Sequence, residues 1–503
     1  MKQLILDFYG YFVFFYSLAL LTSYVLMVWL AYLTIRKAHR TMIDPYVRRI
    51  IDESPFTPGV SIVAPAFNEE KTIVQNVNSL LLQDYPVFEV VIVNDGSRDD
   101  TLKLLIENFG LVQVPYKYEE RIPARPFRGL YRSTLPQYKR LTVVDKENGG
   151  TKADPINAGL NVAQYPYFIN TDVDCILAPD AIFKCIRPMI ETPNCVAVSG
   201  VMTMSNACKV EEGRIIENRV PWRPAPLFQT LEYLRSFLVA KMGWSAINAM
   251  PNVSGGYGMF DREVVINAGG YTADSLAEDM DMLIRIVGYC CDAGRKYRIV
   301  QIPETCCWTE GPSNIKTLYR QRTRWGHGLI QTFARYYHMM CKPRYRQLGL
   351  ITLPYVFLFE FLAPLIEIVG ILTFIYLAFT GGVNWTSALV IFLLVYSFCL
   401  LISIVVIFHD YLRGRSYDGI LSYIKLVVAA LLEPFLYHPI VTVCSIVGYI
   451  RFLRSKEVKW GTMTRKGFGN TTTSAAQQQA AAQPASPASG EGYSMNSGIS
   501  NNP

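Results

Sequence analysis

The sequence predicts an α/β protein: a mostly parallel, Rossmann-like sheet covered by helices, with transmembrane α-helices attached. Short runs rich in Val and Ile alternate with helix-like stretches between about residues 55 and 345. Long apolar runs with little charge flank this region on both sides. Charged residues make up only 18% of the 503 residues and hydrophobic ones 51%, whereas average soluble domains carry about 25% charged residues.

These patterns divide the chain into four parts. Residues 1–54 form an amino-terminal transmembrane helix with a cytosolic juxtamembrane segment, and residues 55–345 form a soluble domain in the cytosol. Residues 346–460 form transmembrane and interface helices, and residues 461–503, rich in small and polar residues, form a disordered tail. Much of the net charge of +7 lies beside apolar runs, where basic residues report topology, so we expect no nucleic-acid partner.

The amino-terminal span is the run Tyr11–Thr34, which is long enough to cross a bilayer. Arg36, Lys37 and Arg40 follow it, and the positive-inside rule therefore places its carboxyl end in the cytosol. A cleaved signal peptide is the alternative, but its apolar run would be shorter and its basic residues would come first.

Three apolar stretches follow the soluble domain. Leu348–Thr380 and Trp385–Phe408 are each long enough for one span. Ile420–Leu453 is too long for one simple span and contains Pro434 and Pro439. We therefore expect a hairpin of two short spans there, with an interfacial helix as the alternative.

Four short runs of the soluble domain are predicted strands, and the stretch between the first two is a predicted helix. The strands are Ser61–Phe67, Val87–Asn94, Leu141–Asp145 and Tyr167–Asn170, and the helix is Glu69–Leu82. Residues 111–140 carry several basic residues among prolines and tyrosines, and they have the character of an inserted loop.

Polar residues follow the predicted strands, at the edge of a parallel sheet where ligands bind. The first strand leads into Glu69, and the second into Asp95, whose Asn-Asp-Gly-Ser context can bind a nucleoside but is also ordinary turn chemistry. Lys152, beside a glycine pair, can contact a diphosphate. Asp172 and Asp174 can hold a divalent cation of the Mg²⁺ type, although an isolated pair of acids is more often a helix cap.

Two further motifs lie nearer the carboxyl end of the domain. Glu278 and Asp279 offer a carboxylate that can take a proton from an acceptor hydroxyl, and one general base suffices for a single displacement with inversion. A solvated acidic helix start is the alternative. The run Gln321–Trp325 combines arginines suited to phosphates with a tryptophan suited to a sugar ring, and a short basic helix before the membrane is its alternative.

In this order and at these separations, the motifs resemble those of the family 2 glycosyltransferases, in particular the processive membrane synthases of cellulose, chitin, hyaluronan and poly-N-acetylglucosamine. The resemblance covers about residues 58–330 and extends to the spans that follow. It implies a nucleotide-binding glycosyltransferase A-type domain that uses UDP-sugars with Mg²⁺ or Mn²⁺. Ala277 stands where many relatives have Thr, which removes a hydroxyl but leaves both neighbouring carboxylates in place.

The resemblance also implies a role for each motif residue. Asp279 would be the general base, with Glu278 beside it, and Ser254–Gly256 would line the acceptor site. The residues expected to bind the donor and its metal ion are Glu69, Asp95 near the uridine, Lys152 near the diphosphate, Asp172 and Asp174. The residues expected to secure the diphosphate and the acceptor are Gln321, Arg322, Arg324, Trp325 and Trp308.

The expected reaction is inverting transfer of a sugar from a UDP-sugar to a growing β-linked polysaccharide, with export of the chain through the spans. Overall likeness favours N-acetylglucosamine. The expected partners are the donor, the nascent polysaccharide, membrane lipids and, where one exists, an envelope subunit; the expected place is the inner (cytoplasmic) membrane. Two alternatives stay open: single-sugar transfer to a lipid carrier or glycolipid, and a non-catalytic membrane scaffold.

Overall fold

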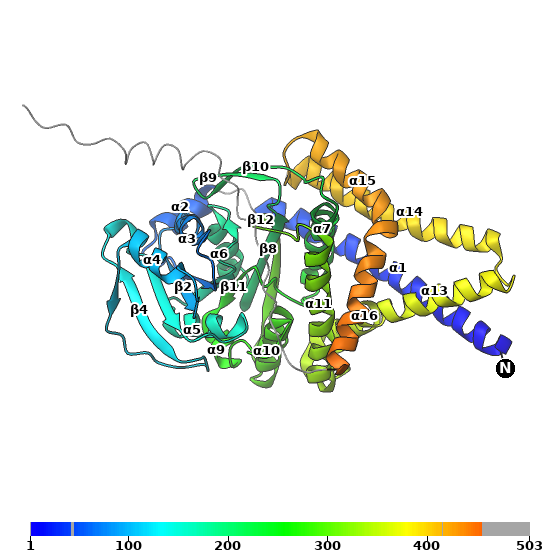
Figure 1. The fold of residues 1–503 in the computed structure, drawn as a ribbon, viewed down its shortest axis with the longest axis horizontal. Helices are drawn as coiled ribbons and strands as arrows, with labels where there is room; N and C mark the ends of the chain where they lie inside the picture. The colour runs from blue at the N-terminus through cyan, green and yellow to red at the C-terminus, as the bar shows by residue number, and fades with distance from the viewer. Residues whose placement is uncertain (1, 42–44, 415, 455–503) are drawn as a thin grey trace, which may run out of the picture. The chain divides into compact units, whose positions relative to one another are not determined.

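The computed structural model describes residues 2–41, 45–414 and 416–454, so the tail predicted for residues 461–503 lies outside the described residues. Ten strands form one mixed sheet, in the order β3-β4-β5-β2-β1-β6-β11-β8-β12-β7 (Figure 1). Its strands are β1 Val60–Ala66, β2 Phe88–Asp95, β3 Leu111–Val114, β4 Phe127–Ser133, β5 Leu141–Lys146, β6 Tyr167–Thr171, β7 Ile176–Leu177, β8 Cys195–Met204, β11 Tyr257–Asp261 and β12 Arg298–Thr309. A separate hairpin pairs β9 Cys208–Glu211 with β10 Arg214–Asn218.

The parallel centre of the sheet consists of β5, β2, β1 and β6. All four strands predicted from the Val- and Ile-rich runs are confirmed here. Strands β1 and β2 are buried along nearly their whole length, which explains why their sequences are almost continuously apolar. The helices around the sheet are α3 Ile73–Leu81, α4 Thr101–Phe109, α5 Ala153–Val162, α6 Ala181–Glu191, α9 Arg262–Asn267 and α10 Glu278–Asp292.

Helix α3 begins four residues later than the sequence predicts. The backbone N–H of Glu69 donates to Thr101 Oγ1 at 2.8 Å, and Asn68 has a left-handed φ of 56°. These contacts hold the residues after β1 in a turn that is tied to the start of α4. The turn therefore remains outside the helix and borders the carboxyl ends of the strands.

The basic stretch 111–140, expected as a loop, instead forms the antiparallel pair β3–β4 at one edge of the sheet. Gly110 ends α4 in the left-handed conformation, with φ of 57°, and turns the chain into β3. Strand β4 then pairs antiparallel with β5. The sequence did not reveal this pair because β3 spans only four residues and is largely exposed.

Three helical stretches are long and apolar enough to cross a membrane: Gly10–Ala38, Leu348–Phe379 and Trp385–Leu412. The first lies in α1 Lys2–Thr41 and the third begins with α14 Trp385–His409. The second combines η5 Leu348–Thr352, α12 Leu353–Val356, η6 Phe357–Phe361 and α13 Ala363–Phe379. Within the described residues, these agree with the spans predicted at both ends of the soluble region.

The last two helices, α15 Ile420–Leu436 and α16 His438–Arg454, do not form the expected hairpin. They are bent by 51° at the break between them, so the chain continues in a similar direction. Pro439 follows His438 and disfavours helical backbone there, which explains a break without a reversal. Together they are one broken span or a re-entrant segment.

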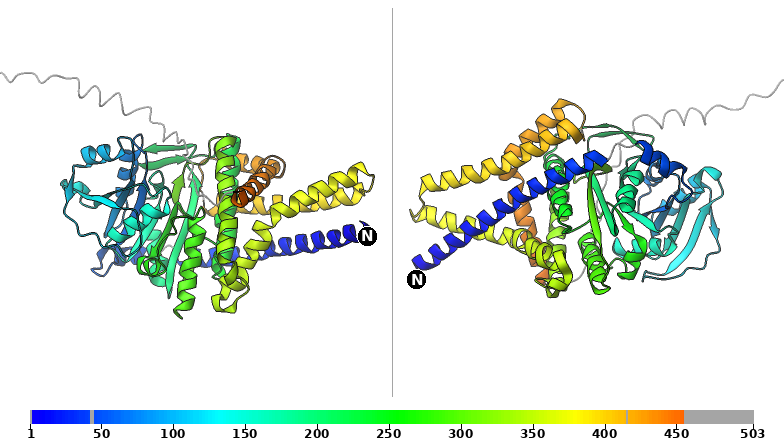
Figure 2. Two further views of the ribbon diagram at one scale, coloured as in Figure 1. Left: turned by 60° about the horizontal axis from the view of Figure 1, so that its bottom comes forward. Right: turned by 180° about the vertical axis from the view of Figure 1, so that it is seen from behind.

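Two long helices lie between the sheet and the membrane-type helices (Figure 2). Helix α7 Pro224–Arg235 contacts α15, and α11 Ile315–Tyr336 contacts α16. The α11–α16 contact is close because it is made at glycines. A Cβ on Gly448 would lie 2.5 Å from the carbonyl oxygen of Thr323, and one on Gly326 would lie 2.7 Å from that of Ser445. The elements η2 Ser236–Lys241 and α8 Met242–Ala246 continue α7 and contact α1.

We predict that Gly448→Val destabilises the protein by about 1–3 kcal/mol, because overpacking forces two helix backbones apart. Thermal unfolding of the detergent-solubilised protein measures this as a lower midpoint. Gly10→Val is the matched control, since a Cβ at Gly10 meets no atom within 4 Å. Equal midpoints for the two variants would show that α11 and α16 do not pack as described.

Candidate active site

Asp95 ends β2 and is buried in a network of hydrogen bonds. Its Oδ1 accepts from Lys146 Nζ at 2.6 Å and from the backbone N–H of Gly149 at 3.0 Å. Burial raises the pKa of Asp95 above its ordinary value, and the Lys146 ammonium opposes that rise. Lys146 also forms an ion pair with Asp154. The two acids and the lysine thus fix the Gly149–Gly150 loop beside the end of β2.

Lys146 and Asp154 were not identified as site residues from the sequence. Lys146 is the last residue of β5, next to Asp95 in register, and its side chain is fully buried. A lysine at the end of a Val-rich strand, two positions before the Asn-Gly-Gly run, was the signal that could have found it. A Cβ on Gly149 would lie 2.5 Å from Asp154 Cβ, which explains the glycine.

Glu69 lies in the turn after β1 and is tied to the loop after β2. Its Oε2 accepts a hydrogen bond from Thr72 at 3.1 Å, and the neighbouring N–H of Asn68 donates to Ser97 Oγ at 3.0 Å. These bonds hold the turn after β1 against the Asp-Gly-Ser motif. The structure therefore places Glu69 and Asp95 at the same edge of the sheet.

Lys152 lies at the start of α5 and reaches the end of β6. Its Nζ is 2.5 Å from Asp172 Oδ1 and donates to the carbonyl oxygen of Gly255 at 2.6 Å. Burial lowers the pKa of Lys152, but the Asp172 and Glu278 carboxylates outweigh it and leave the pKa above its ordinary value. Lys152 therefore carries a charge between two acidic groups that are far apart in the sequence.

Asp172 and Asp174 follow β6, and Cys175 lies beside them. One ligand atom from each of the three residues lies within 4.8 Å of the others. Asp174 is buried, whereas the side chain of Asp172 is 30% exposed. Hard cations bind one or two carboxylates and complete their shell with phosphate oxygens and water. The residues present thus fit a divalent cation that is shared with a bound diphosphate.

The loop at Gly255–Gly256 brings the two acidic pairs together. A Cβ on Gly255 would lie 3.3 Å from Glu278 Oε1 and 3.7 Å from Asp279 Cβ. One on Gly256 would lie 3.6 Å from Asp172 Oδ2. The loop is held on β6, because Thr171 Oγ1 donates to Gly256 O at 3.0 Å. The acids near residues 172 and 279 therefore flank one loop, as a single site requires.

Asp279 lies in the first turn of α10 and is partly accessible. Its Oδ2 accepts from Asn252 Nδ2 at 2.7 Å, and its Oδ1 from the backbone N–H of Met280 at 2.9 Å. Glu278 is buried, and burial together with the Asp279 charge raises the pKa of Glu278. The acidic residues in the first turn of α10 thus include the candidate general base, Asp279. Asn252 is a further contact that the sequence did not reveal.

The four predicted site residues of the Gln321–Trp325 run, which lies on α11, have different neighbours. Arg322 is buried and forms a two-pronged ion pair with Glu232 of α7, with Nη1 2.7 Å from Oε1. Its guanidinium also lies 4.3 Å from the centre of the Trp325 ring. Arg324 instead acts on Glu278, whose pKa it lowers against the effect of burial. Gln321 accepts from Gln229 of α7 at 3.0 Å.

Glu232 joins α11 to the bend between α15 and α16. Tyr437 OH donates to Glu232 Oε2 at 2.7 Å and accepts from Arg322 Nη2 at 2.7 Å. Burial alone would raise the pKa of Glu232, but Arg322 outweighs it and leaves that pKa below its ordinary value. In this structure Arg322 is thus engaged with α7 and Tyr437. A role for Arg322 at the diphosphate stays a prediction.

Trp308 lies in β12, which pairs with β7 directly after the Asp174–Cys175 segment. Its indole Nε1 is buried and has no hydrogen-bond acceptor among the described residues. A buried N–H group without an acceptor is costly, and a bound ligand oxygen can satisfy it. This placement is compatible with the acceptor role expected for Trp308.

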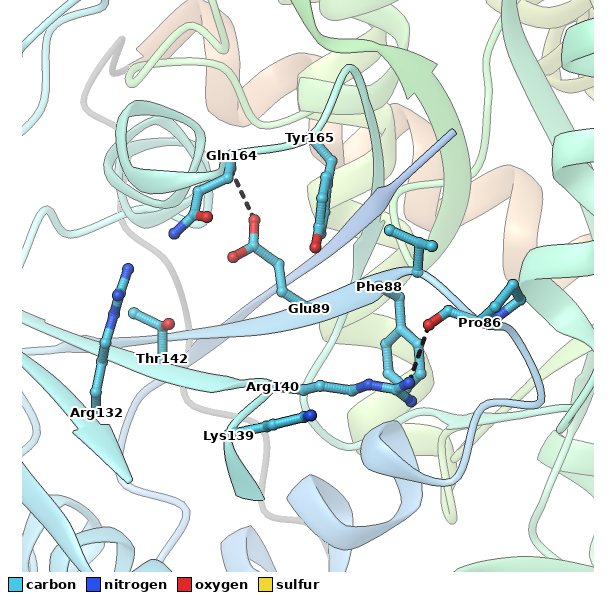
Figure 3. A pocket seen from close by; sticks show the side chains of 10 residues that line it. Pro86, Phe88, Glu89, Arg132, Lys139, Arg140, Thr142, Gln164 and Tyr165 are labelled. Carbon is cyan, nitrogen blue, oxygen red and sulfur yellow. Dashed lines mark hydrogen bonds between the residues drawn. The ribbon is translucent and has the colours of Figure 1, made fainter. Parts of the chain in front are cut away.

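A separate hollow of about 360 Å³ lies at the opposite ends of the parallel strands (Figure 3). Its lining includes Phe88 and Glu89, where β2 begins, and Arg140, just before β5. Arg140 donates to the carbonyl oxygen of Pro86 at 3.0 Å, and Glu89 accepts from the backbone N–H of Gln164 at 2.7 Å. No predicted site residue lines this hollow, so it is distinct from the candidate active site.

Comparisons with known proteins agree with this geometry. Residues 61–114 and 127–265 match a model described as glycosyl transferase family 2, and residues 219–408 match one described as glycosyl transferase family group 2. A poly-beta-1,6-N-acetyl-D-glucosamine synthase of Staphylococcus epidermidis is 24% identical over 338 residues, which cover 66% of this chain and 70% of that protein. The protein of the same name in Staphylococcus aureus (strain COL) is 25% identical over 286 residues, covering 57% and 58%.

Among solved structures, a mannosyltransferase from Pyrobaculum calidifontis in complex with GDP-Man and Mn²⁺ aligns with a TM-score of 0.47 and 19% identity. The alignment covers 87% of this chain and 98% of that one. The two family models, which together match most of residues 61–408, show the family of the chain. The chain is a family 2 glycosyltransferase of the polysaccharide synthase-like type, built on a glycosyltransferase A-type fold.

Proposed function

We propose that this protein transfers a sugar, with inversion, from a UDP-sugar to a growing β-linked polysaccharide at the cytosolic face of the inner membrane. The observation that carries the proposal is the Gly255–Gly256 loop, which has Asp172 on one side and Glu278–Asp279 on the other. A metal-bound donor and a general base are thereby available to one reaction centre.

The donor side would be formed by Asp95, Lys152, Asp172 and Asp174. Mg²⁺ or Mn²⁺, held by Asp174 and Asp172, would neutralise charge on the leaving diphosphate. Lys152 supplies a fixed positive charge at the same place, through its contact with Asp172. Asp95, held by Lys146 and Gly149, presents its carboxylate group at the nucleoside end. Glu69 would belong to this side as well.

The acceptor side would be formed by Asp279 and the Gly255–Gly256 loop. Asp279 takes the proton of the attacking hydroxyl, and Asn252 holds its carboxylate in place through the 2.7 Å hydrogen bond. Glu278 is buried beside it, and burial together with the Asp279 charge raises the pKa of Glu278. Trp308, Arg324 and Trp325 would contact the sugar end.

Residues 1–54 and 346–460 would anchor a cytosolic domain of residues 55–345 in the bilayer. Within the described residues, helices of both flanking regions contact the soluble part: α1 meets α8, and α16 meets α11. Because α15 and α16 pack on α7 and α11, we assign this bent pair to the membrane interface. The spans would then carry the growing chain away from the site.

The direct test is synthesis by the purified, detergent-solubilised protein. We expect UDP-N-acetylglucosamine with Mg²⁺ or Mn²⁺ to give a radiolabelled product of high molecular weight, because the relatives are poly-N-acetylglucosamine synthases. Gel filtration of the product and UDP release measure this. Formation of a monosaccharide-lipid alone would replace the proposal by single-sugar transfer, and no transfer from any UDP-sugar would favour a scaffold.

We predict that Asp279→Asn lowers the rate of UDP release at least about 10²-fold, the contribution typical of a general base. Because the amide keeps the shape of the side chain, UDP binding measured by calorimetry should stay within about twofold. Asp292→Asn, at the exposed end of the same helix, is the control and should leave the rate unchanged. A fully active Asp279→Asn variant would remove Asp279 from the mechanism.

We predict that Asp174→Asn raises the Mn²⁺ concentration needed for half-maximal UDP release by at least about tenfold, since loss of metal-site groups costs that much affinity. Asp180→Asn, an exposed acid that pairs with Lys184, is the control. An unchanged metal titration in the Asp174→Asn variant would place the cation elsewhere.

A further inference from the structure

The hollow at the opposite ends of the parallel strands has the size of a small-molecule site (Figure 3). Its volume of about 360 Å³ lies within the range of about 300–1,000 Å³ that is usual for such sites. Its lining comes from the start of β2, the end of β4, the start of β5 and the turn between α5 and β6. The hollow is therefore formed by the sheet domain, and none of its lining residues belongs to a membrane-type helix.

A buried acid fixes one wall of the hollow. Glu89 Oε1 accepts hydrogen bonds from Ser61 Oγ and from the backbone N–H of Gln164, each at 2.7 Å. Ser61 Oγ in turn accepts from the backbone N–H of Tyr165 at 3.3 Å. The Tyr165 ring covers Gly59 so closely that a Cβ there would overlap it. The Glu89 carboxylate is thus engaged in holding the turn before β6, and this wall is rigid.

Arg140 is fixed on another side of the hollow (Figure 3). Its Cζ lies 4.4 Å from the centre of the Phe88 ring, and its Nη2 donates to the carbonyl oxygen of Pro86 at 3.0 Å. Its backbone is held by β2, because the N–H of Val90 donates to the carbonyl oxygen of Arg140 at 2.8 Å. A guanidinium group has several N–H donors, so this preorganised cation can still bind an acceptor in the hollow.

Two further cations, Arg132 and Lys139, line the same hollow and are exposed. Within the described residues, neither side chain has an ion pair or a hydrogen bond. Arg132 pairs with Thr142 across β4 and β5, and Thr142 lies two positions after Arg140, so these three side chains share one face of the sheet. The lining thus has three cations and one acid, Glu89, and a cleft with an excess of one charge concentrates ions of the other sign.

We propose that this hollow binds a small organic phosphate, with its phosphate group on Arg132, Lys139 and Arg140. Arginine binds phosphate oxygens in a two-pronged manner, and lysine adds a point charge. The amide of Gln164 and the ring of Tyr165 would face the organic part, which is a sugar or a nucleoside. The site lies at the other ends of the strands from the candidate active site, so this inference does not rest on the proposed function.

Calorimetric titration of the detergent-solubilised protein with AMP, N-acetylglucosamine 1-phosphate and inorganic phosphate tests the proposal. EDTA is present throughout, because the candidate active site is proposed to hold its diphosphate through a divalent cation. We expect one organic phosphate to bind at one molecule per chain and at least about tenfold more tightly than inorganic phosphate. The tighter ligand of the two tells a nucleotide from a sugar phosphate. If neither binds more tightly than inorganic phosphate, the proposal is overturned.

Three variants locate the binding site. We expect Arg132→Glu and Lys139→Glu each to raise the Kd at least about tenfold, because each removes a charge-assisted hydrogen bond and adds repulsion. Arg128→Glu is the matched control, since Arg128 is an exposed arginine of the same strand β4 that does not line the hollow. It should leave the Kd within about twofold. All three residues are exposed, so thermal unfolding midpoints should stay at the wild-type value.

Two results of this comparison would contradict the proposal. An unchanged Kd in both Arg132→Glu and Lys139→Glu would place the ligand elsewhere. An equal rise in Arg128→Glu would show a diffuse effect of surface charge instead of a site. The binding assay needs no sugar transfer, so its outcome is separate from that of the proposed function.

Discussion

The candidate site depends on two contacts of the Lys152 ammonium group, one with Asp172 and one with the carbonyl oxygen of Gly255. It joins the end of β6 to the loop that borders Glu278 and Asp279. Carboxylates brought this close would otherwise repel one another, because like charges disfavour each other's ionised form. A buried lysine between them allows acids from two distant regions of the chain, Asp172 and Glu278, to share one site.

Lys146 has a comparable role at the end of the site that is proposed to bind the nucleoside. Its buried ammonium group lies between Asp95 and Asp154 and fixes the Gly149–Gly150 loop. Each of the two buried lysines interacts with two acidic groups: Lys146 with Asp95 and Asp154, and Lys152 with Asp172 and Glu278.

The site is also connected to the membrane-type helices through α11. Gly328 of α11 allows the helix to pack against Ala277, directly before Glu278, and Gly326 allows it to pack against α16. Arg322 joins the same helix to Glu232 and Tyr437. Buried ion pairs add little net stability, but breaking one is costly, so this network favours a single arrangement of α7, α11 and the α15–α16 bend.

The features that depend on a local sequence pattern were predictable. Runs of Val and Ile revealed the parallel strands, because those strands are buried on both faces, and the polar residues at their ends therefore revealed much of the site. Contacts between distant residues were not predictable. The pairing of Glu232 with Arg322 spans 90 positions. The short, exposed strand β3 and the 51° bend after α15 lacked a pattern that separates them from a loop and a hairpin.

A structure of the protein with UDP and Mn²⁺ bound, determined by electron cryomicroscopy, tests the central claim most directly, that the acids flanking Gly255–Gly256 form one reaction centre. The account predicts Mn²⁺ on the carboxylates of Asp172 and Asp174, in contact with the diphosphate. Asp279 should face the same space, where an acceptor hydroxyl can approach it to about 2.6–3.2 Å. Mn²⁺ and UDP bound on a side of the Gly255–Gly256 loop that Asp279 cannot reach would contradict it.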